Sequence, residues 1–344
     1  MTEDRRHHPE EMAYDELGAI SSVFCLFPSL IYFFIVRSQF AQIEQDTYRV
    51  QVLSTRVALC LPLYAILLYI ALLDAEAYEA LMVVVTVIEG YAFYCFFSLL
   101  VINMGGPTET VRAMKQDNNT LCCIKMCCAP CSCCCPKDIT KFYNQASMLI
   151  WHFMITRSIV ICFGAVCFYT GTTVGHALYV VSALVGFVML VSALLSLVNL
   201  YENIYKYCLN INGVGKLLLL KVSVGTITGL GIVETLIVAF GGSVTPPDSN
   251  DDDEADMTQR AYAFLMLLIM CVLSLFSYNF FTAKMTVPRI LYNTSEISEV
   301  EFKVSMNKFV CDMLSFRDVY GIIRLKDEPL IDNDTLVNKD GNWL

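Results

Sequence analysis

Three ionisable side chains stand inside long apolar stretches of this sequence, where a charge is costly: Glu89, Arg157 and Glu234. Ionisable residues within membrane-spanning helices are rare, and they mark substrate paths, ion paths or internal ion pairs. Arg157 either attracts the anionic end of a substrate from a cavity or pairs with Glu89 and holds two helices together. The residue types allow both roles. His152 lies about a turn from Arg157 and belongs to the same candidate path.

Aromatic side chains surround the first of these charges in the sequence. Tyr91 and Tyr94 follow Glu89, together with Phe93, Phe96 and Phe97. Aromatic rings can stack on a flat, sterol-like ligand, but they serve more often to pack helices. We take Tyr91 and Tyr94 as candidate substrate-path residues and keep helix packing as the alternative.

Half of the sixteen cysteines crowd into one short tract, which ends at Pro136. A zinc site needs four ligands at a defined spacing. Cys128 and Cys131 fit half of one, but there is no second, separated pair and no nearby His, so metal binding is the weaker alternative. Disulfides are disfavoured in a reducing compartment. Juxtamembrane cysteines are the usual targets of S-acylation, which anchors a loop to the membrane. We therefore predict lipidation of Cys122, Cys123, Cys127, Cys128, Cys131, Cys133, Cys134 and Cys135.

Composition indicates the elements that must position these residues. The 344-residue chain is 56% hydrophobic and 16% charged, with a mean hydropathy of +0.56. Crossing a bilayer takes roughly 20 mostly apolar residues in helical conformation. The sequence predicts an all-α polytopic membrane protein with seven transmembrane helices. The predicted spans are about 16–36, 57–73, 80–104, 147–169, 176–202, 217–241 and 261–283.

The distribution of basic residues predicts the orientation. Segments on one side of the predicted spans contain 19 Lys and Arg residues, and segments on the other side contain 3. Basic loops stay in the cytosol. We therefore expect an extracellular N-terminus (1–15), a membrane domain (16–283) and a cytosolic tail (284–344).

Two polar segments lie outside the predicted spans. The stretch Pro246–Asp256 is acidic, and its composition favours a solvated, flexible linker over a calcium site. In the tail, Ser298 and Glu301 form a capping-box pattern, and apolar residues then recur at helical spacing. This pattern predicts an amphipathic helix over about 299–315 that packs on the cytosolic face of the bundle or on the membrane surface.

Several functional classes are excluded or disfavoured. The net charge of −10 argues against nucleic-acid binding. No P-loop, HExxH, GxSxG or dinucleotide-binding motif is present, so we expect no enzyme, no cofactor and no ATP-driven transport within this chain.

The motifs, taken in order, resemble the alpha subunit of the organic solute transporter and its seven-span relatives. The resemblance rests on Glu89–Leu100 followed by Gly105 and Gly106, on the cysteine tract, and on the aromatic approach Trp151–Phe153 to Arg157. A linker from Tyr201 to Lys221 also matches. The sequence departs from the family at Ser158, where the family often has proline.

This resemblance implies facilitated transport of amphipathic organic solutes such as steroid conjugates or bile-acid-like anions. The partners that it implies are membrane lipids and either a single-span beta-like subunit or a second copy of the chain. The protein is expected in the plasma membrane or an endomembrane. A seven-span receptor, or a scaffold or trafficking protein without a transported ligand, is the alternative. Neither an outer-loop cysteine pair nor an acylated tail, both common in receptors, is evident.

Overall fold

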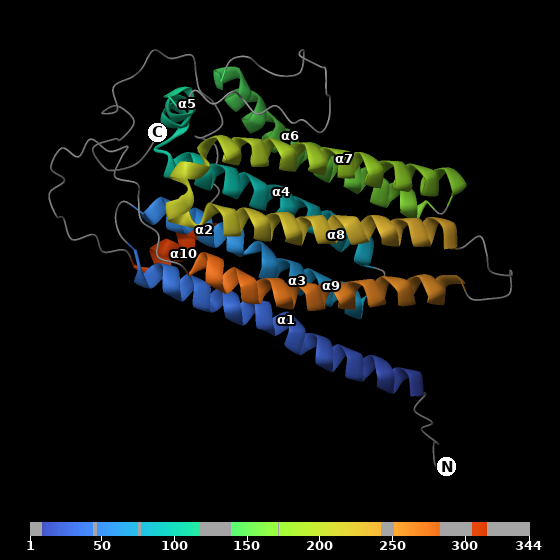
Figure 1. The fold of residues 1–344 in the computed structure, drawn as a ribbon. Coiled ribbons are helices and arrows are strands. Elements are labelled where there is room, and N and C mark those ends of the chain that lie inside the picture. Colours follow the sequence, from blue (N-terminus) through green and yellow to red (C-terminus); the bar gives the residue numbers. More distant parts are fainter. Residues whose placement is uncertain are drawn as a thin grey trace, which may run out of the picture.

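The computed structural model describes residues 9–43, 47–74, 77–116, 139–170, 172–241, 251–282 and 305–314, which form helices and short connections without a strand (Figure 1). This confirms the predicted all-α class. The helices are α1 (Pro9–Ala41), α2 (Tyr48–Ala58), α3 (Cys60–Leu73), α4 (Tyr78–Asn103), α5 (Pro107–Gln116), α6 (Ile139–Tyr169), α7 (Thr173–Ile204), α8 (Gly213–Gly241), α9 (Asp251–Phe281) and α10 (Met306–Leu314), with two 3₁₀ turns at Tyr205–Tyr207 and Leu209–Ile211.

Seven helical segments of the described chain are long and apolar enough to cross a membrane, which confirms the predicted spans. They are Gly18–Ala41, Tyr48–Leu73, Ala80–Asn103, Ile139–Tyr169, Thr173–Tyr207, Gly213–Val233 and Arg260–Phe281. The chain is thus a multi-pass membrane protein. The side on which each end lies stays a prediction.

The second span is longer than its apolar stretch because two helices share it. α2 ends at Ala58, and α3 begins at Cys60. The predicted span began at Val57, and Pro62 lies two residues into α3. Proline has no N–H and cannot donate to the carbonyl of the residue four positions earlier, here Ala58. The helix therefore breaks at Leu59 and resumes. α2 carries Arg56, which the sequence had placed in a cytosolic loop, into the bundle, where it is 1% exposed.

All the spans run roughly along one direction, with α5, α10 and the start of α2 gathered at the same end (Figure 1). α4 packs against α2, α3 and α6, while α9 packs against α1, α3 and α8. α6 and α7 form the most extensive helix pair. One continuous core of buried side chains joins these helices. The aromatic residues Phe93, Tyr94, Phe96 and Phe97 belong to that core.

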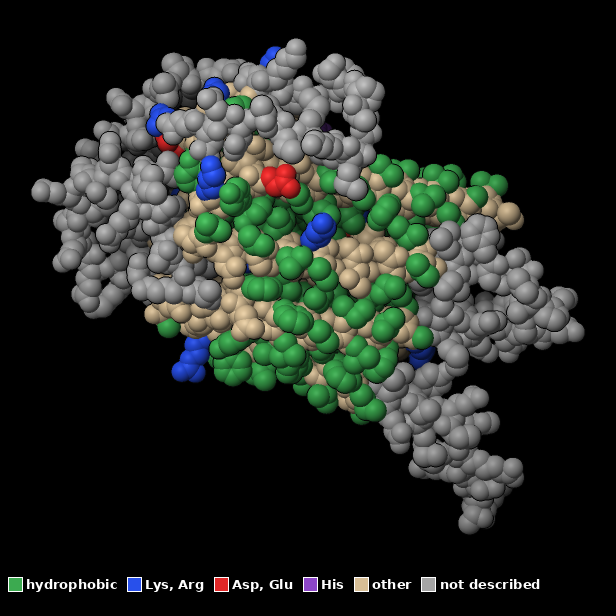
Figure 2. Space-filling model, viewed as in Figure 1, with side chains coloured by type: hydrophobic (Ala, Val, Ile, Leu, Met, Phe, Trp, Pro, Cys, Tyr) green, Lys and Arg blue, Asp and Glu red, His purple; other side chains and the backbone are tan. Residues whose placement is uncertain are grey.

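Hydrophobic side chains cover the middle of the outer face, and most of the visible Lys and Arg side chains lie toward the end that carries α5 and α10 (Figure 2). Large apolar residues of the described chain are strongly exposed, among them Leu26 at 67%, Val188 at 63% and Val174 at 69%. In water such a surface would promote association. In a bilayer it contacts lipid tails.

The Gly105–Gly106 pair forms the turn between α4 and α5. Its φ angles are +89° and +110°, in the left-handed region that residues with a side chain rarely adopt. The Gly106 N–H donates to Val101 O at 2.9 Å, and the Gly105 N–H donates to Ile102 O at 2.9 Å. These two hydrogen bonds form a Schellman cap. The motif that marked the family resemblance therefore ends α4 and directs the chain into α5.

The acidic segment Pro246–Asp256 differs in part from its prediction as a flexible linker. Its second half, from Asp251, begins α9 instead. Carboxylates in the first turn of a helix are stabilised by the positive end of the helix dipole. The acidic run therefore favours helix initiation as well as solvation, an effect that the composition alone did not reveal.

The tail helix α10 packs against α2 at the end of the bundle. Within the predicted range 299–315, the described helix covers Met306–Leu314, and at its start the Ser305 side chain accepts from Lys308 N at 3.2 Å. Residues 299–304 lie outside the described part. Phe309 is fully buried between the rings of Phe40 and Tyr48, at centroid distances of 5.9 and 6.1 Å. Of the two predicted surfaces, α10 covers the bundle.

Arg56 fixes the C-terminal end of α10. Its Nε donates to Met313 O at 2.9 Å and its Nη2 donates to Asp312 O. Asp312 also accepts from the Tyr48 hydroxyl at 2.5 Å. A guanidinium at these carbonyls satisfies helix-end acceptors and complements the negative end of the dipole.

Replacing Arg56 with methionine is expected to loosen α10. A hydrogen bond from a charged donor contributes about 1.5–3 kcal/mol, so the loss of even one should make the amides of α10 exchange hydrogen for deuterium at least roughly tenfold faster. Hydrogen-exchange mass spectrometry of the purified protein measures this. Arg37→Met, at an exposed arginine of α1, is the control. Equal exchange in both variants would contradict a role for Arg56 in holding the helix.

Candidate functional site

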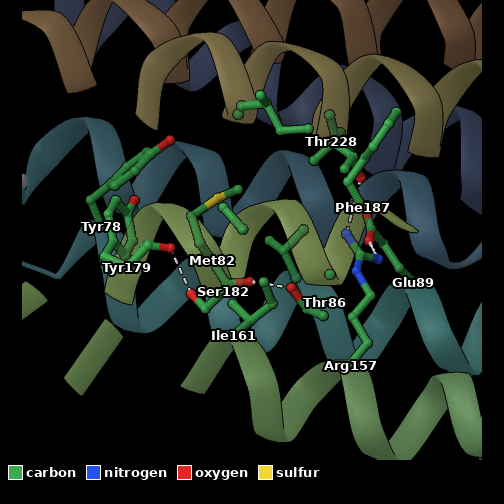
Figure 3. A pocket seen from close by; sticks show the side chains of 16 residues that line it. Tyr78, Met82, Thr86, Glu89, Arg157, Ile161, Tyr179, Ser182, Phe187 and Thr228 are labelled. Atoms are coloured by element: carbon green, nitrogen blue, oxygen red, sulfur yellow. Dashed lines mark hydrogen bonds and ion pairs between the residues drawn. The ribbon is translucent and has the colours of Figure 1, made fainter. Parts of the chain in front are cut away.

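A cleft opens between α4, α6, α7 and α8 (Figure 3). Its lining is mostly apolar, with an ion pair at one end. The lining residues are Tyr78, Met82, Val85, Thr86, Glu89, Arg157, Ile161, Tyr179, Ser182, Ala183, Gly186, Phe187, Ile227, Thr228, Gly231 and Ile232. Phe187 is 38% exposed, so the wall between α7 and α8 is only partly closed.

The structure brings Glu89 of α4 and Arg157 of α6 together as a buried ion pair (Figure 3). Their side chains are 1% and 6% exposed, and Arg157 Nη1 donates to Glu89 Oε2. Arg157 Nη2 donates to the Thr228 hydroxyl of α8 at 3.0 Å, and the guanidinium lies 5.3 Å from the Phe153 ring centre. The arginine therefore joins three helices at one point. The predicted pairing is present, and it lies in a cleft.

The pair does not use all of its hydrogen-bonding capacity. Within the described residues, the buried atoms Glu89 Oε1 and Arg157 Nε have no hydrogen-bond partner. A buried polar group left unsatisfied costs about 1–3 kcal/mol, so such atoms in a native structure call for a partner such as water or a ligand. One donor and one acceptor at the cleft are thus available to a bound molecule.

Two glycines allow α4 and α7 to approach α6 closely around the pair. A Cβ on Gly90 would lie 2.8 Å from the backbone Cα of Met154 in α6. A Cβ on Gly186 of α7 would lie 2.8 Å from Ile161 and 3.9 Å from the stem of Arg157. Small residues permit such contacts between membrane helices. The glycine after Glu89 therefore sets the distance between α4 and α6 at the site.

Polar groups along the cleft wall are engaged with their own helices. The Thr86 hydroxyl donates to Met82 O at 2.9 Å, and the Ser182 hydroxyl donates to Tyr179 O at 2.7 Å (Figure 3). At the far end of the cleft from the ion pair, the Tyr78 ring packs against Tyr262 of α9. The wall is therefore largely apolar in character, with oxygen atoms at intervals.

The remaining predicted path residues do not line the cleft. Tyr94 is buried and packs edge-on against Trp151, with ring centres 6.1 Å apart, so it is a packing residue. Tyr91 is partly buried beside the core. His152 is on the exposed face of α6, away from the pair. The assignment of these three residues to a substrate path stays a prediction, and aromatic content alone does not show which helix face turns inward.

Two sets of predicted residues lie where no side chain is described. Glu234 falls within α8, but its side chain lies outside the described part. The eight cysteines of the tract Cys122–Cys135 also lie outside it, so their lipidation stays a prediction. The Cys208 thiol, at the turn after α7, is described and is buried. Burial raises the pKa of this thiol to about 12, although a hydrogen bond with the Asn103 side chain acts in the opposite direction. Cys208 therefore stays a protonated packing residue.

Sequence reasoning missed the wall contributed by α7 and α8. Tyr179, Ser182 and Gly186 recur at helical spacing on one face of α7, and Thr228 and Gly231 do so on α8. Polar and small residues in register within an apolar helix were an available signal for an inward face. The part of the chain that the structure describes contains no group of three His, Cys, Asp or Glu side chains able to hold a metal ion.

Seven spans, four of which line a partly open cleft with a buried ion pair, define a polytopic helical membrane protein with a candidate solute site. The sequence model for the family described as "Organic solute transporter Ostalpha" matches residues 17–286. The match spans most of the chain, and this chain belongs to that family. It is accordingly a membrane transporter of organic solutes, in a family that is generally not enzymatic. Neither curated proteins nor solved structures gave a significant match.

Proposed function

We propose that this chain moves amphipathic organic anions, such as steroid conjugates or bile-acid-like molecules, across the membrane through the cleft without ATP hydrolysis. The observation that carries the proposal is Arg157, a buried cation whose Nε faces no partner among the described residues at the end of an apolar cleft. A guanidinium is always charged and suits carboxylate and sulfate groups. It would hold the anionic end of the solute.

The apolar wall supports an amphipathic solute rather than a small ion. Val85, Ile161, Ile227 and Ile232 extend from the ion pair toward Tyr78. Burial of apolar surface contributes roughly 25 cal/mol per Å², so a steroid body would be stabilised along this wall while its charged group reaches Arg157. The partly exposed Phe187 lies where a solute would enter from the lipid side, between α7 and α8.

Transport on this route requires the cleft to widen. Its enclosed volume is about 80 Å³, whereas sites for drug-sized ligands measure roughly 300–1,000 Å³. α8 is tied to Arg157 by a single hydrogen bond from Nη2 to Thr228. Release of that bond would let α8 move away from α6. The solute's own binding energy would then drive the change, in keeping with a facilitated carrier.

The proposal includes partners. Membrane lipids surround the exposed apolar faces, and the family resemblance supports a single-span beta-like subunit or a second copy of the chain. On α8, added Cβ atoms at Gly225 and Gly229 would meet nothing within 4 Å. These two glycines therefore make no close helix contact within the described residues. Gly231 does approach the Tyr262 hydroxyl, at 3.4 Å from an added Cβ.

Uptake of a radiolabelled steroid sulfate into proteoliposomes tests the proposal. The wild-type protein is expected to equilibrate the solute faster than empty vesicles. Uptake by the variant Arg157→Gln/Glu89→Gln is expected to be slower by about tenfold or more, since the charged guanidinium that binds the sulfate contributes at least about 1.4 kcal/mol. The double change keeps the buried site neutral, which separates loss of binding from loss of folding. Arg112→Gln, at an exposed arginine paired with Glu109 at 2.8 Å, is the matched control. Unchanged uptake in the double variant, or none in the wild type, would overturn the proposal.

A further inference from the structure

Beyond the ion pair, the cleft wall has hydroxyl groups from two of the helices that line it. Thr86 of α4 comes three residues before Glu89, so it lies about 4.5 Å along the helix axis from that residue. Ser182 of α7 lies further along, because a Cβ on Gly164 of α6 would overlap the Ser182 Oγ. Gly164 comes seven residues after Arg157, which is roughly 10 Å along α6. The Ser182 hydroxyl is therefore separated from the level of the ion pair by about the length of a steroid nucleus.

Each of these hydroxyls already uses its only donor. The Thr86 hydroxyl donates to Met82 O at 2.9 Å, and the Ser182 hydroxyl donates to Tyr179 O at 2.7 Å (Figure 3). Such bonds to the preceding turn are a known pattern for Ser and Thr within helices. A hydroxyl oxygen also has two acceptor lone pairs. Ser182 can therefore accept a hydrogen bond from a bound molecule without giving up the bond that it makes.

The Ser182 oxygen is also held at one place. The residue is 6% exposed, its hydroxyl is bonded to its own helix, and Gly164 packs beside it. Ser182 and Arg157 lie on α7 and α6, the most extensive helix pair, so their separation persists when α8 moves. The cleft therefore presents a cation and an acceptor at a set separation, with apolar side chains between them. Two such points can select a solute by the groups at its two ends.

We infer that Ser182 determines specificity in this transporter, by favouring amphipathic anions that carry a hydroxyl group at the end opposite their charge. The anionic group binds Arg157, the rigid apolar body lies along the wall, and the distal hydroxyl donates to Ser182 Oγ. A distal ketone has no hydrogen to donate. The Ser182 hydroxyl would have to leave Tyr179 O to bind that ketone, so one hydrogen bond would replace another without a net gain. This inference rests on the proposed function.

Competition between two steroid 3-sulfates tests the inference with the full chain in proteoliposomes. The two compounds differ only at C17, where one has a hydroxyl group and the other a ketone. Each is added at rising concentration against uptake of a labelled steroid sulfate, and the ratio of the two half-inhibitory concentrations is measured. A net hydrogen bond between neutral groups corresponds to roughly threefold to tenfold in affinity, so the hydroxyl sulfate should gain that factor over the ketone sulfate from Ser182.

The variant Ser182→Ala should shift this ratio by about threefold to tenfold toward the ketone sulfate, since it removes the acceptor. Because the ratio is compared between two proteins, any difference in how the two sulfates enter the lipid cancels. Ser192→Ala is the matched control on the same helix. The Ser192 hydroxyl makes the same kind of bond, to Val188 O at 2.8 Å, but it is exposed, so this variant should keep the wild-type ratio.

The unfolding temperature gives the same comparison without transport, since a ligand that binds more tightly stabilises the folded protein more. Relative to the ketone sulfate, the hydroxyl sulfate should raise this temperature more in the wild type than in Ser182→Ala. The same ratio and the same temperature difference in both proteins would overturn the role of Ser182 alone. Labelled uptake by the wild type that does not exceed uptake by empty vesicles would overturn the proposed function.

Discussion

Replacement of Arg157 with glutamine is expected to lower the free energy of unfolding by about 3–5 kcal/mol, since it leaves the carboxylate of Glu89 buried without its counter-ion. Glu89 is 1% exposed, and no second cation lies beside it among the described residues that face it. Glu89→Gln should have an effect of similar size, because it leaves the guanidinium uncompensated. Each single variant breaks one half of the same pair.

The double variant Glu89→Gln/Arg157→Gln should be more stable than either single variant. It removes both charges, and two amide side chains can hydrogen-bond to each other. Unfolding in a mild detergent, followed by tryptophan fluorescence or a thermal shift, would give the four free energies of the cycle. Additive single effects would show that the two residues do not act as a pair, against the structure.

Bound steroid sulfate offers a second readout of the same cycle. In Glu89→Gln the anion supplies the counter-ion that Arg157 has lost, so the ligand should raise the unfolding temperature of this variant more than that of the wild type. In Arg157→Gln it should raise the unfolding temperature least. A structural pair without a binding role predicts no such difference between the variants.

The membrane spans could be predicted because the bilayer selects for length and apolarity, which are properties of the sequence alone. Glu89 and Arg157 could be selected for the same reason: a charge in an apolar run has few acceptable environments. The structure adds that the two residues meet and that a cleft lies beside them. Both facts depend on which helix faces which, and hydropathy does not carry that information.

Arg56 and Lys216 show where charge counting fails. Both were assigned to cytosolic loops, yet each is 1% exposed within a helix. Arg56 binds the backbone of α10, and Lys216 lies 5.4 Å from the ring centre of Phe281. Long basic side chains near a helix end are expected to reach the interface. Here partners far along the chain hold them inside, and local sequence cannot reveal such partners.

Ends of helices were the other weak point, for a related reason. α6 begins at Ile139, before the apolar stretch predicted from 147, and α9 begins at Asp251 rather than at 261. Hydropathy detects the part of a helix that lies in lipid. The part beyond the lipid is stabilised by caps, by the helix dipole and by packing, so a polar sequence such as Asp251–Asp253 can belong to the same helix.

Gly90→Ala is expected to damage both folding and transport, although it adds one methyl group. The new Cβ would lie 2.8 Å from the Cα of Met154, a backbone atom that no rotamer change can move. α4 and α6 would have to separate, at an overpacking cost of about 1–3 kcal/mol. Because Gly90 is adjacent to Glu89, that separation also lengthens the bond from Glu89 to Arg157.

Gly225→Ala provides a matched control, since it makes the same chemical change on α8, where an added Cβ meets nothing within 4 Å. Alanine is favoured over glycine inside a helix by up to about 1 kcal/mol, so this variant should be as stable as the wild type or slightly more stable. Thermal unfolding and steroid sulfate uptake, measured side by side, should separate the two variants. Equal stability and equal uptake in Gly90→Ala and Gly225→Ala would contradict this prediction. The close contact between α4 and α6 would then not be what holds Glu89 against Arg157.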